Sequence, residues 1–433
     1  MSAAGRLKTF RKLLAHLRET LGLDIGFRLW DGSLFPDDWP EDAFAVRIAD
    51  EGVVAALLRS PRAETLANIW VTKRIDFDNG DIFDLLERRP DMRSREIRKR
   101  VSKLRIGATL ARFLFVKRGG PWPLDDMAPD RPTDGSSEEN RRNIAFHYDV
   151  SNAFYELFLD REMVYSCGYC TRWDNDLDRM QRDKLEMICR KLRLKPGETL
   201  LDIGCGWGAL SLYAAENYGV TTHGVTLSEQ QFEYARAKAE RMGLADRCRF
   251  ELADYAAVEG QFDKVAAIGI QEHIGIDNYP DYYATVRRVL KPDGIFLHQA
   301  VTRPAKRDAR DNRVRSRDQN LLARYVFPGT ALDNIGNTLQ QLEQHGFEVH
   351  DVEGWREHYQ RTCRHWHDRL NANYDKAVKE GGEITTRLWL IYLAGCSVAF
   401  QRNTMRLYQT VSTVRRRGPA PLPPTREDLY RDV

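Results

Sequence analysis

Residues 200–215 read LLDIGCGWGALSLYAA and place three glycines between an apolar run and a run with the character of a helix. Glycine inside a strand or helix costs stability, so its concentration at Gly204, Gly206 and Gly208 predicts a sharp turn. Such a turn lets the backbone approach a ligand closely, and the following helix offers free backbone N–H groups. We expect Asp202, the acid just before the turn, either to order it or to meet a cationic group of the ligand.

The sequence around this turn alternates between strand-like and helix-like segments. The predicted strands are 198–204, 221–227, 248–254, 262–269, 294–301 and 347–355. The predicted helices are 208–219, 228–243, 278–291 and 337–346, and a mainly helical segment follows residue 355. This alternation predicts an α/β fold with a parallel sheet covered by helices on both faces.

Composition excludes several classes of protein. The chain has 433 residues, of which 42% are hydrophobic, and its net charge is only +3, so it is neither disordered nor a globally basic nucleic-acid binder. Seven cysteines without zinc spacing predict no metal site and no disulfide framework, and indicate a cytoplasmic protein. No uncharged run reaches the roughly 18–20 residues of a membrane span. We therefore expect a soluble protein, or at most one that binds membranes peripherally.

The chain divides into three parts on these patterns. Residues 1–120 predict a small α+β domain, with a helix at 5–23, a strand at 43–50 and a helical run at 63–89. Residues 121–138 are rich in Pro, Gly, Asp and Ser and predict a linker. The alternating pattern occupies residues 139–433.

The glycines follow the spacing G-x-G-x-G, which departs from the dinucleotide fingerprint G-x-G-x-x-G. This form resembles the nucleoside-binding loop of S-adenosylmethionine-dependent methyltransferases. Ligands of such folds lie beyond the carboxyl ends of the strands. We expect the ribose near Thr226, Leu227 and Gln231, and adenine between Asp254 and Tyr255. A glycine-rich turn in another kind of α/β protein is the alternative.

Several separate stretches resemble one family, the cyclopropane-fatty-acyl-phospholipid synthases with the related mycolic acid cyclopropane synthases. The most specific are HYDVSN at 147–152 and YSCGY at 165–169; others are GVTLSEQQ at 224–231, IQEHIG at 270–275, RYVFPG at 324–329 and YLAGCSVAF at 392–400. The resemblance spans about residues 139–410. It implies a Rossmann-like class I methyltransferase domain with a mainly parallel seven-stranded sheet, preceded by a lipid-binding domain.

The resemblance also implies a reaction and its residues. The family adds the methyl group of S-adenosylmethionine to the double bond of an acyl chain, and loss of a proton from the new methyl closes a cyclopropane ring. Its base is a bound bicarbonate ion. The matching catalytic positions here are Cys167, Glu272, His298, Tyr325 and Cys396. Tyr165 and Ser166 match positions at the cofactor.

This sequence departs from the family at Gln271, where relatives often have Phe, and at Ala300, where they often have Ile. These changes leave open a rival product, a methylene- or methyl-branched acyl chain. A small-molecule N- or O-methyltransferase and a lipid-binding protein without activity are further alternatives. Cys396 also suits a buried apolar position in a helix.

An unsaturated phospholipid substrate would require contact with a membrane. Two basic stretches, 93–105 and 302–317, could approach an anionic bilayer, and the second is the better candidate because it lies near His298 and Tyr325 in sequence. A solvated charged helix explains the first stretch equally well. The resemblance further implies a homodimer, and nothing points to a nucleic-acid partner.

Overall fold

The computed structural model describes residues 2–88, 94–127, 150–306 and 330–430. These residues form two compact units. The first comprises residues 1–129 with 383–394, and the second comprises residues 130–382 with 395–433.

The first unit is built on a small mixed sheet of order β2-β1-β3-β4. Its strands are β1 (Gly26–Arg28), β2 (Leu34–Phe35), β3 (Ala45–Ile48) and β4 (Ile75–Asp78). Its helices are α1 (Ala3–Leu21), α2 (Glu51–Arg59), α3 (Ala63–Val71), α4 (Ile82–Glu87), α5 (Ser94–Arg100), α6 (Lys103–Phe113) and α7 (Pro123–Met127). Residues of α7 fall inside the segment predicted as a linker.

The predicted helical run at 63–89 is wrong in its middle. Strand β4 separates α3 from α4 and pairs antiparallel with β3. Its sequence, IDFD, alternates apolar and acidic residues with a period of two, which suits a strand better than a helix. This strand is the fourth strand of the sheet in the first unit.

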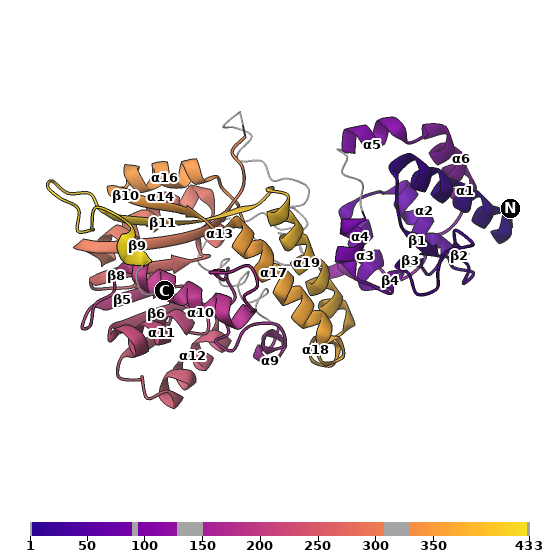
Figure 1. Cartoon of the computed structure of the whole chain (residues 1–433). Coiled ribbons are helices and arrows are strands. Elements are labelled where there is room, and N and C mark those ends of the chain that lie inside the picture. The colour runs from indigo at the N-terminus through magenta and orange to yellow at the C-terminus, as the bar shows by residue number, and fades with distance from the viewer. Residues whose placement is uncertain (1, 89–93, 128–149, 307–329, 431–433) are drawn as a thin grey trace. The chain divides into compact units, whose positions relative to one another are not determined.

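The second unit confirms the predicted α/β fold. Its seven-stranded sheet has the order β10-β11-β9-β8-β5-β6-β7 (Figure 1). The strands are β5 (Thr199–Ile203), β6 (Thr221–Thr226), β7 (Cys248–Leu252), β8 (Phe262–Ile268), β9 (Leu290–Thr302), β10 (Phe347–Gly354) and β11 (Arg406–Val414). Strands β5 to β9 are parallel, and β11 lies antiparallel between β9 and β10.

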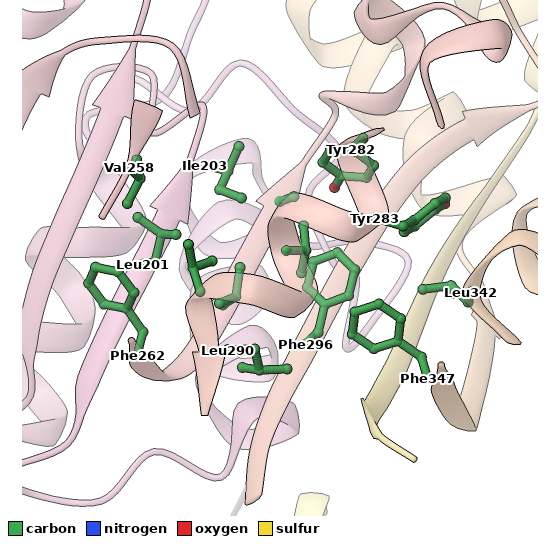
Figure 2. Packing of buried hydrophobic residues seen from close by; sticks show 14 of the residues in the cluster. Leu201, Ile203, Val258, Phe262, Tyr282, Tyr283, Leu290, Phe296, Leu342 and Phe347 are labelled. Carbon is green, nitrogen blue, oxygen red and sulfur yellow. The ribbon is translucent and has the colours of Figure 1, made fainter. Parts of the chain in front are cut away.

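Helices cover both faces of this sheet. The helices that follow the first unit in the chain are α9 (Asn152–Glu156), α10 (Leu177–Leu192), α11 (Ala209–Tyr218), α12 (Glu229–Arg241), α13 (Gln271–Ile274), α14 (Tyr279–Val289), α16 (Ile335–Gln344), α17 (Arg356–Ala372), α18 (Tyr374–Gly381) and α19 (Glu383–Gln401), of which residues 383–394 of α19 belong to the first unit. Figure 2 shows one face, where Tyr282 and Tyr283 of α14 pack with Phe296 of β9 and Phe347 of β10. Neighbouring residues of β9, such as Leu297, point to the opposite face and join a second core with α10 and α11.

Strand β11 was not expected from the sequence, which predicts a mainly helical segment there. Every residue from Leu407 to Thr413 except Tyr408 is buried, so β11 is an interior strand. An interior strand covered on both faces lacks the alternation of buried and exposed residues that marks a half-exposed strand. Its pairing with β9 sets His298 opposite Thr410 and Val301 opposite Leu407.

The proline-rich C-terminal segment packs against its own chain. Arg190 of α10 donates to the Leu429 carbonyl at 3.2 Å, and Arg193 pairs with Asp428 at 2.9 Å. The segment covers a cavity of about 400 Å³ whose lining includes Lys191 and His350. Among the described residues, no helix has the length and apolar character needed to cross a bilayer.

Candidate active site

The glycine turn follows β5 directly and bends the chain with backbone angles that glycine favours. Gly204, Gly206 and Gly208 have φ values of +71°, +56° and +84°. A Cβ atom on Gly204 would lie 2.0 Å from the Ile270 side chain, whereas one on Gly206 would meet nothing within 4 Å. Gly204 is therefore required for packing, and the backbone at Gly206 borders open space into which a ligand can fit.

Asp202 resolves one of the alternatives that the sequence leaves open. Its side chain is buried and accepts a hydrogen bond from the Ser211 hydroxyl of α11 at 3.0 Å. Burial raises the pKa of this carboxyl to about 6. Because the bond joins the end of β5 to the helix after the turn, Asp202 orders the turn.

The other residues predicted at the cofactor lie at the carboxyl ends of the next two strands. Thr226, at the end of β6, donates its hydroxyl to Gln231 Oε1 at 2.9 Å, and Leu227 follows directly. After β7, Asp254 caps a short helical turn by accepting the Ala256 N–H at 2.9 Å. Carboxyl ends of neighbouring parallel strands share one edge, so the sheet brings these side chains to the edge that holds the glycine turn.

Tyr165 belongs to an aromatic cluster beside the glycine turn. Its ring lies 5.5 Å from Tyr155 and 5.0 Å from Trp366, and Tyr155 lies 4.9 Å from Trp207 of the turn. Tyr155 has no exposed surface. The cluster therefore ties the segment that carries Tyr165 and Ser166 to the turn through close packing. Tyr255, by contrast, packs edge-on against Tyr282 at 5.5 Å.

Glu272 is buried in α13, just beyond the end of β8. Its Oε1 accepts the Val301 N–H of β9 at 2.6 Å, while its buried Oε2 has no partner in the described part of the chain. Burial raises the pKa of this carboxyl to about 7, and no cation in the described part of the chain lowers it. Near neutral pH a substantial fraction of Glu272 therefore carries a proton.

His298 lies in the middle of β9 with only 1% of its surface exposed. The centre of its ring lies 6.2 Å from that of Tyr282 and 6.3 Å from that of Tyr283. Its Nε2 has no partner among the described residues. Burial lowers the pKa of the imidazole to about 3. His298 is therefore neutral at physiological pH.

The strand register connects Cys167 to the same region. The Cys167 thiol is fully buried and lies 3.9 Å from the Trp355 carbonyl, and the Trp355 N–H donates to the carbonyl of Leu407. Leu407 is the β11 residue opposite Val301, which binds Glu272. Burial raises the pKa of the Cys167 thiol well above its ordinary value, so the thiol stays protonated and is a poor nucleophile.

Tyr359 of α17 is a site residue that sequence reasoning missed. Burial raises its pKa, and Cys363, Cys167, Cys396 and Glu272 are close enough to raise it further. Nothing in its local sequence marks it, since its place depends on how α17 packs beside β11. The structure thus brings Cys167, Glu272, Cys396 and Tyr359 together.

Two further predictions have different outcomes. Tyr325 lies outside the described residues. Arg303, part of the basic stretch expected to touch a membrane, is 7% exposed and donates to the Leu332 carbonyl at 2.7 Å. Its guanidinium is therefore unavailable to a bilayer surface, and that part of the expectation is wrong.

Comparison with known proteins gives consistent relatives. The family model described as mycolic acid cyclopropane synthetase matches residues 135–410. A probable fatty acid methyltransferase of Pseudomonas putida is 33% identical over 422 residues, which is 95% of this chain and 98% of that protein. The cyclopropane-fatty-acyl-phospholipid synthase of Escherichia coli strain K12 is 36% identical over 268 residues, or 61% of this chain and 66% of that protein.

Solved structures agree with these relatives. The cyclopropane synthase MmaA2 of Mycobacterium tuberculosis superposes with a TM-score of 0.60 at 29% identity, covering 66% of this chain and 99% of that one. The mycolic acid cyclopropane synthase CmaA1, solved with SAH and CTAB, gives 0.60 at 30% identity, covering 63% and 98%. The chain therefore belongs to the cyclopropane synthase family of S-adenosylmethionine-dependent C-methyltransferases.

Proposed function

We propose that the protein transfers the methyl group of S-adenosylmethionine to the cis double bond of an unsaturated phospholipid acyl chain and forms a cyclopropane ring. The observation that carries this proposal is that buried Glu272 and His298 each have a polar atom without a partner among the described residues, with Tyr359 near Glu272. An alkene has no proton to lose before it attacks a methyl group. The site must therefore first align the alkene with the methyl group and exclude water, and a base is needed only after the methyl transfer.

The described side chains suit a dry site. Cys167 and Tyr155 have no exposed surface, and Trp207 and Trp366 are almost fully buried. Water excluded by such packing cannot add to a carbocation. The aromatic residues of this cluster contact one another, so we assign them to the wall of the site and not to direct contact with the substrate.

The same residues fit a small anion such as bicarbonate. Glu272 Oε2 and His298 Nε2 are buried polar atoms without partners among the described residues, and such atoms cost stability unless a ligand binds them. A protonated Glu272 donates a hydrogen bond to an anion, whereas an ionised one would repel it. Tyr359, which is near Glu272, would add an O–H donor, whereas the Cys167 S–H already donates to the Gly168 carbonyl at 3.1 Å. Bound there, bicarbonate would supply the base that accepts a proton from the new methyl group.

A methylene- or methyl-branched product is the second candidate. The relative matched along nearly the whole chain is named a probable fatty acid methyltransferase, and a tuberculostearic acid methyltransferase of Mycobacterium tuberculosis is 32% identical over 331 residues. Gln271 places a polar amide in the buried site region, where it donates to Thr338 at 3.0 Å. The cyclopropane and the methylene branch begin with the same methyl transfer and differ in how the carbocation loses a proton. A methyl branch would additionally need a separate reductase that saturates the methylene group.

The first unit carries a surface suited to a bilayer. On α6, Leu104, Ala108 and Ala111 recur on one helical face, which Phe115 extends just past the helix end, and all four are exposed. Leu104 is 86% exposed and Phe115 is 93% exposed. The opposite face of the helix buries Phe113. We call the four exposed residues the α6 stripe.

Cations surround the α6 stripe. The exposed basic residues on or beside it are Lys99, Arg100, Lys103, Arg105, Arg112 and Lys117. Apolar side chains that enter a bilayer and cations that remain at its surface are the features of a peripheral membrane helix. We therefore assign this helix, whose first three residues lie in the first of the two basic stretches, to contact with anionic phospholipid.

Methyl transfer to lipid tests the proposed function directly. With tritiated S-adenosylmethionine and vesicles of unsaturated phospholipid, we expect tritium in the lipid. Proton NMR then separates the products, because cyclopropane methylene protons resonate far upfield and exocyclic alkene protons far downfield. Label found only in added amine or hydroxyl acceptors would contradict the proposal.

Glu272→Gln and His298→Gln test the anion site. We expect each to bind S-adenosylhomocysteine within about threefold of the unaltered protein while turnover falls on the order of 100-fold or more, because each removes one partner of the base. Exposed Glu240→Gln on α12 is the matched control and keeps full turnover. Full activity in both site variants would refute the assignment, and equal loss of cofactor affinity would show a structural role.

Glu272 also predicts a pH-dependent stability. Its folded pKa of about 7 exceeds the ordinary 4.5, so the unfolded chain loses this proton first as pH rises. Relative to Glu272→Gln, the unaltered protein should lose about 3 kcal/mol of unfolding free energy between pH 5 and pH 8. Urea denaturation without bicarbonate measures this difference. Parallel pH curves for the two proteins would contradict it.

The α6 stripe is tested by vesicle sedimentation. Replacing Leu104 and Phe115 by serine should weaken binding to vesicles containing phosphatidylglycerol at least tenfold, because two large apolar side chains no longer enter the bilayer. Leu66→Ser, at a 43% exposed position on α3, is the control and should bind normally. Rising salt should also weaken binding. Unchanged binding of the double variant would overturn the assignment.

A further inference from the structure

Lys184 of α10 is a buried cation that the proposed reaction does not use. Its side chain is 3% exposed, and its ammonium makes one hydrogen bond within the described chain, to Ser166 Oγ at 3.3 Å. An ammonium has three N–H donors, and burying it without a close anion is costly. We therefore expect the Lys184 ammonium to have a further hydrogen-bond acceptor, such as an anionic ligand.

The nearest carboxylates are committed to other groups. Asp160 accepts the N–H groups of Glu162 and Val164, both at 2.9 Å, and Asp202 accepts the Ser211 hydroxyl. Both influence Lys184 electrostatically, yet neither forms an ion pair with it within 4 Å in the described part of the chain. Burial outweighs them and lowers the pKa of Lys184 to about 8.

Gln181, nearly one turn earlier on α10, fixes the backbone next to this charge. Its side-chain N–H donates to the Ser166 carbonyl at 2.8 Å and approaches the Val164 carbonyl at 3.4 Å. Gln181 is fully buried, and its Oε1 has no partner among the described residues. The backbone of Ser166 and the ammonium facing its hydroxyl are thus both held by α10.

The bond from Lys184 fixes what the Ser166 hydroxyl can do. A protonated lysine only donates, so Ser166 Oγ must accept in this bond. The hydroxyl keeps its own proton for another acceptor, and Ser166 donates to no described group. An acceptor that meets this proton would also lie near a positive charge, which selects for an anionic oxygen.

We propose that Lys184 is a positioning residue that orients the Ser166 hydroxyl toward the carboxylate of the cofactor's amino-acid end and attracts that carboxylate by its charge. This inference rests on the proposed function and on the family resemblance, which implies that Tyr165 and Ser166 contact the cofactor. Asp160 and Asp202 weaken this attraction, because the positive charge of the Lys184 ammonium partly balances their negative charges before a ligand binds. The carboxylate of the ligand then accepts the proton of the Ser166 hydroxyl.

Two ligands separate this role from a structural one. S-adenosylhomocysteine carries the amino-acid end, whereas 5′-methylthioadenosine has the same nucleoside and sulfur without it. Calorimetry with Lys184→Met should show at least a tenfold loss of affinity for the first and less than a twofold change for the second. Ser166→Ala should behave likewise, and the double variant should lose no more than Lys184→Met alone.

Lys191→Met is the matched control. Lys191 is also buried on α10, but its ammonium already binds Glu353 and, at 2.7 Å, Gln409. This variant should lower the unfolding temperature without changing the ratio of the two affinities. Unchanged S-adenosylhomocysteine affinity in Lys184→Met, or equal losses for both ligands, would overturn the inference. If the unaltered protein bound neither ligand, the proposed function itself would fail.

Discussion

Burial of Glu272 without a cation among the described residues is the constraint around which the candidate site is organised. An ionised carboxyl in such surroundings is unfavourable, and the one described hydrogen bond to its side chain, from the Val301 N–H, satisfies only Oε1. The phenol of Tyr359 is near Glu272, and burial raises the pKa of that phenol as well. In the proposed function, these neutral groups would donate hydrogen bonds to a small anion.

The arrangement of strands explains how these residues meet although they are far apart in sequence. Parallel strands β5 to β8 all end at the edge where the glycine turn and α13 begin, so the cofactor residues and Glu272 share that edge. Strand β11 then returns antiparallel to β9 and carries the backbone contact to Trp355, beside Cys167. In the proposed function, two different features of one sheet would therefore position the cofactor and the base.

How much of this could be predicted depends on whether the signal is local. The parallel strands and the glycine turn have local sequence patterns, and both were predicted from those patterns. Gly206, for example, has the positive φ expected of a glycine in a sharp turn. Strand β11 was missed because burial on both faces removes the alternation that marks a strand. Tyr359 and Lys184 carry no local pattern at all. Their importance arises from what each helix packs against, which a single sequence does not display.

Ser166 and Cys167 show why the two sets of contacts belong to one site. They are consecutive residues, yet Ser166 bonds Lys184 of α10 while Cys167 lies against the Trp355 carbonyl and influences Tyr359. Gly168, the next residue, is fixed by its N–H bond to Thr362 at 3.0 Å. A shift of this short segment would therefore move the proposed cofactor contact of Ser166 and the surroundings of Tyr359 together. Because methyl transfer and proton removal act on the same carbon, a single rigid segment is an effective way to keep both contacts in register.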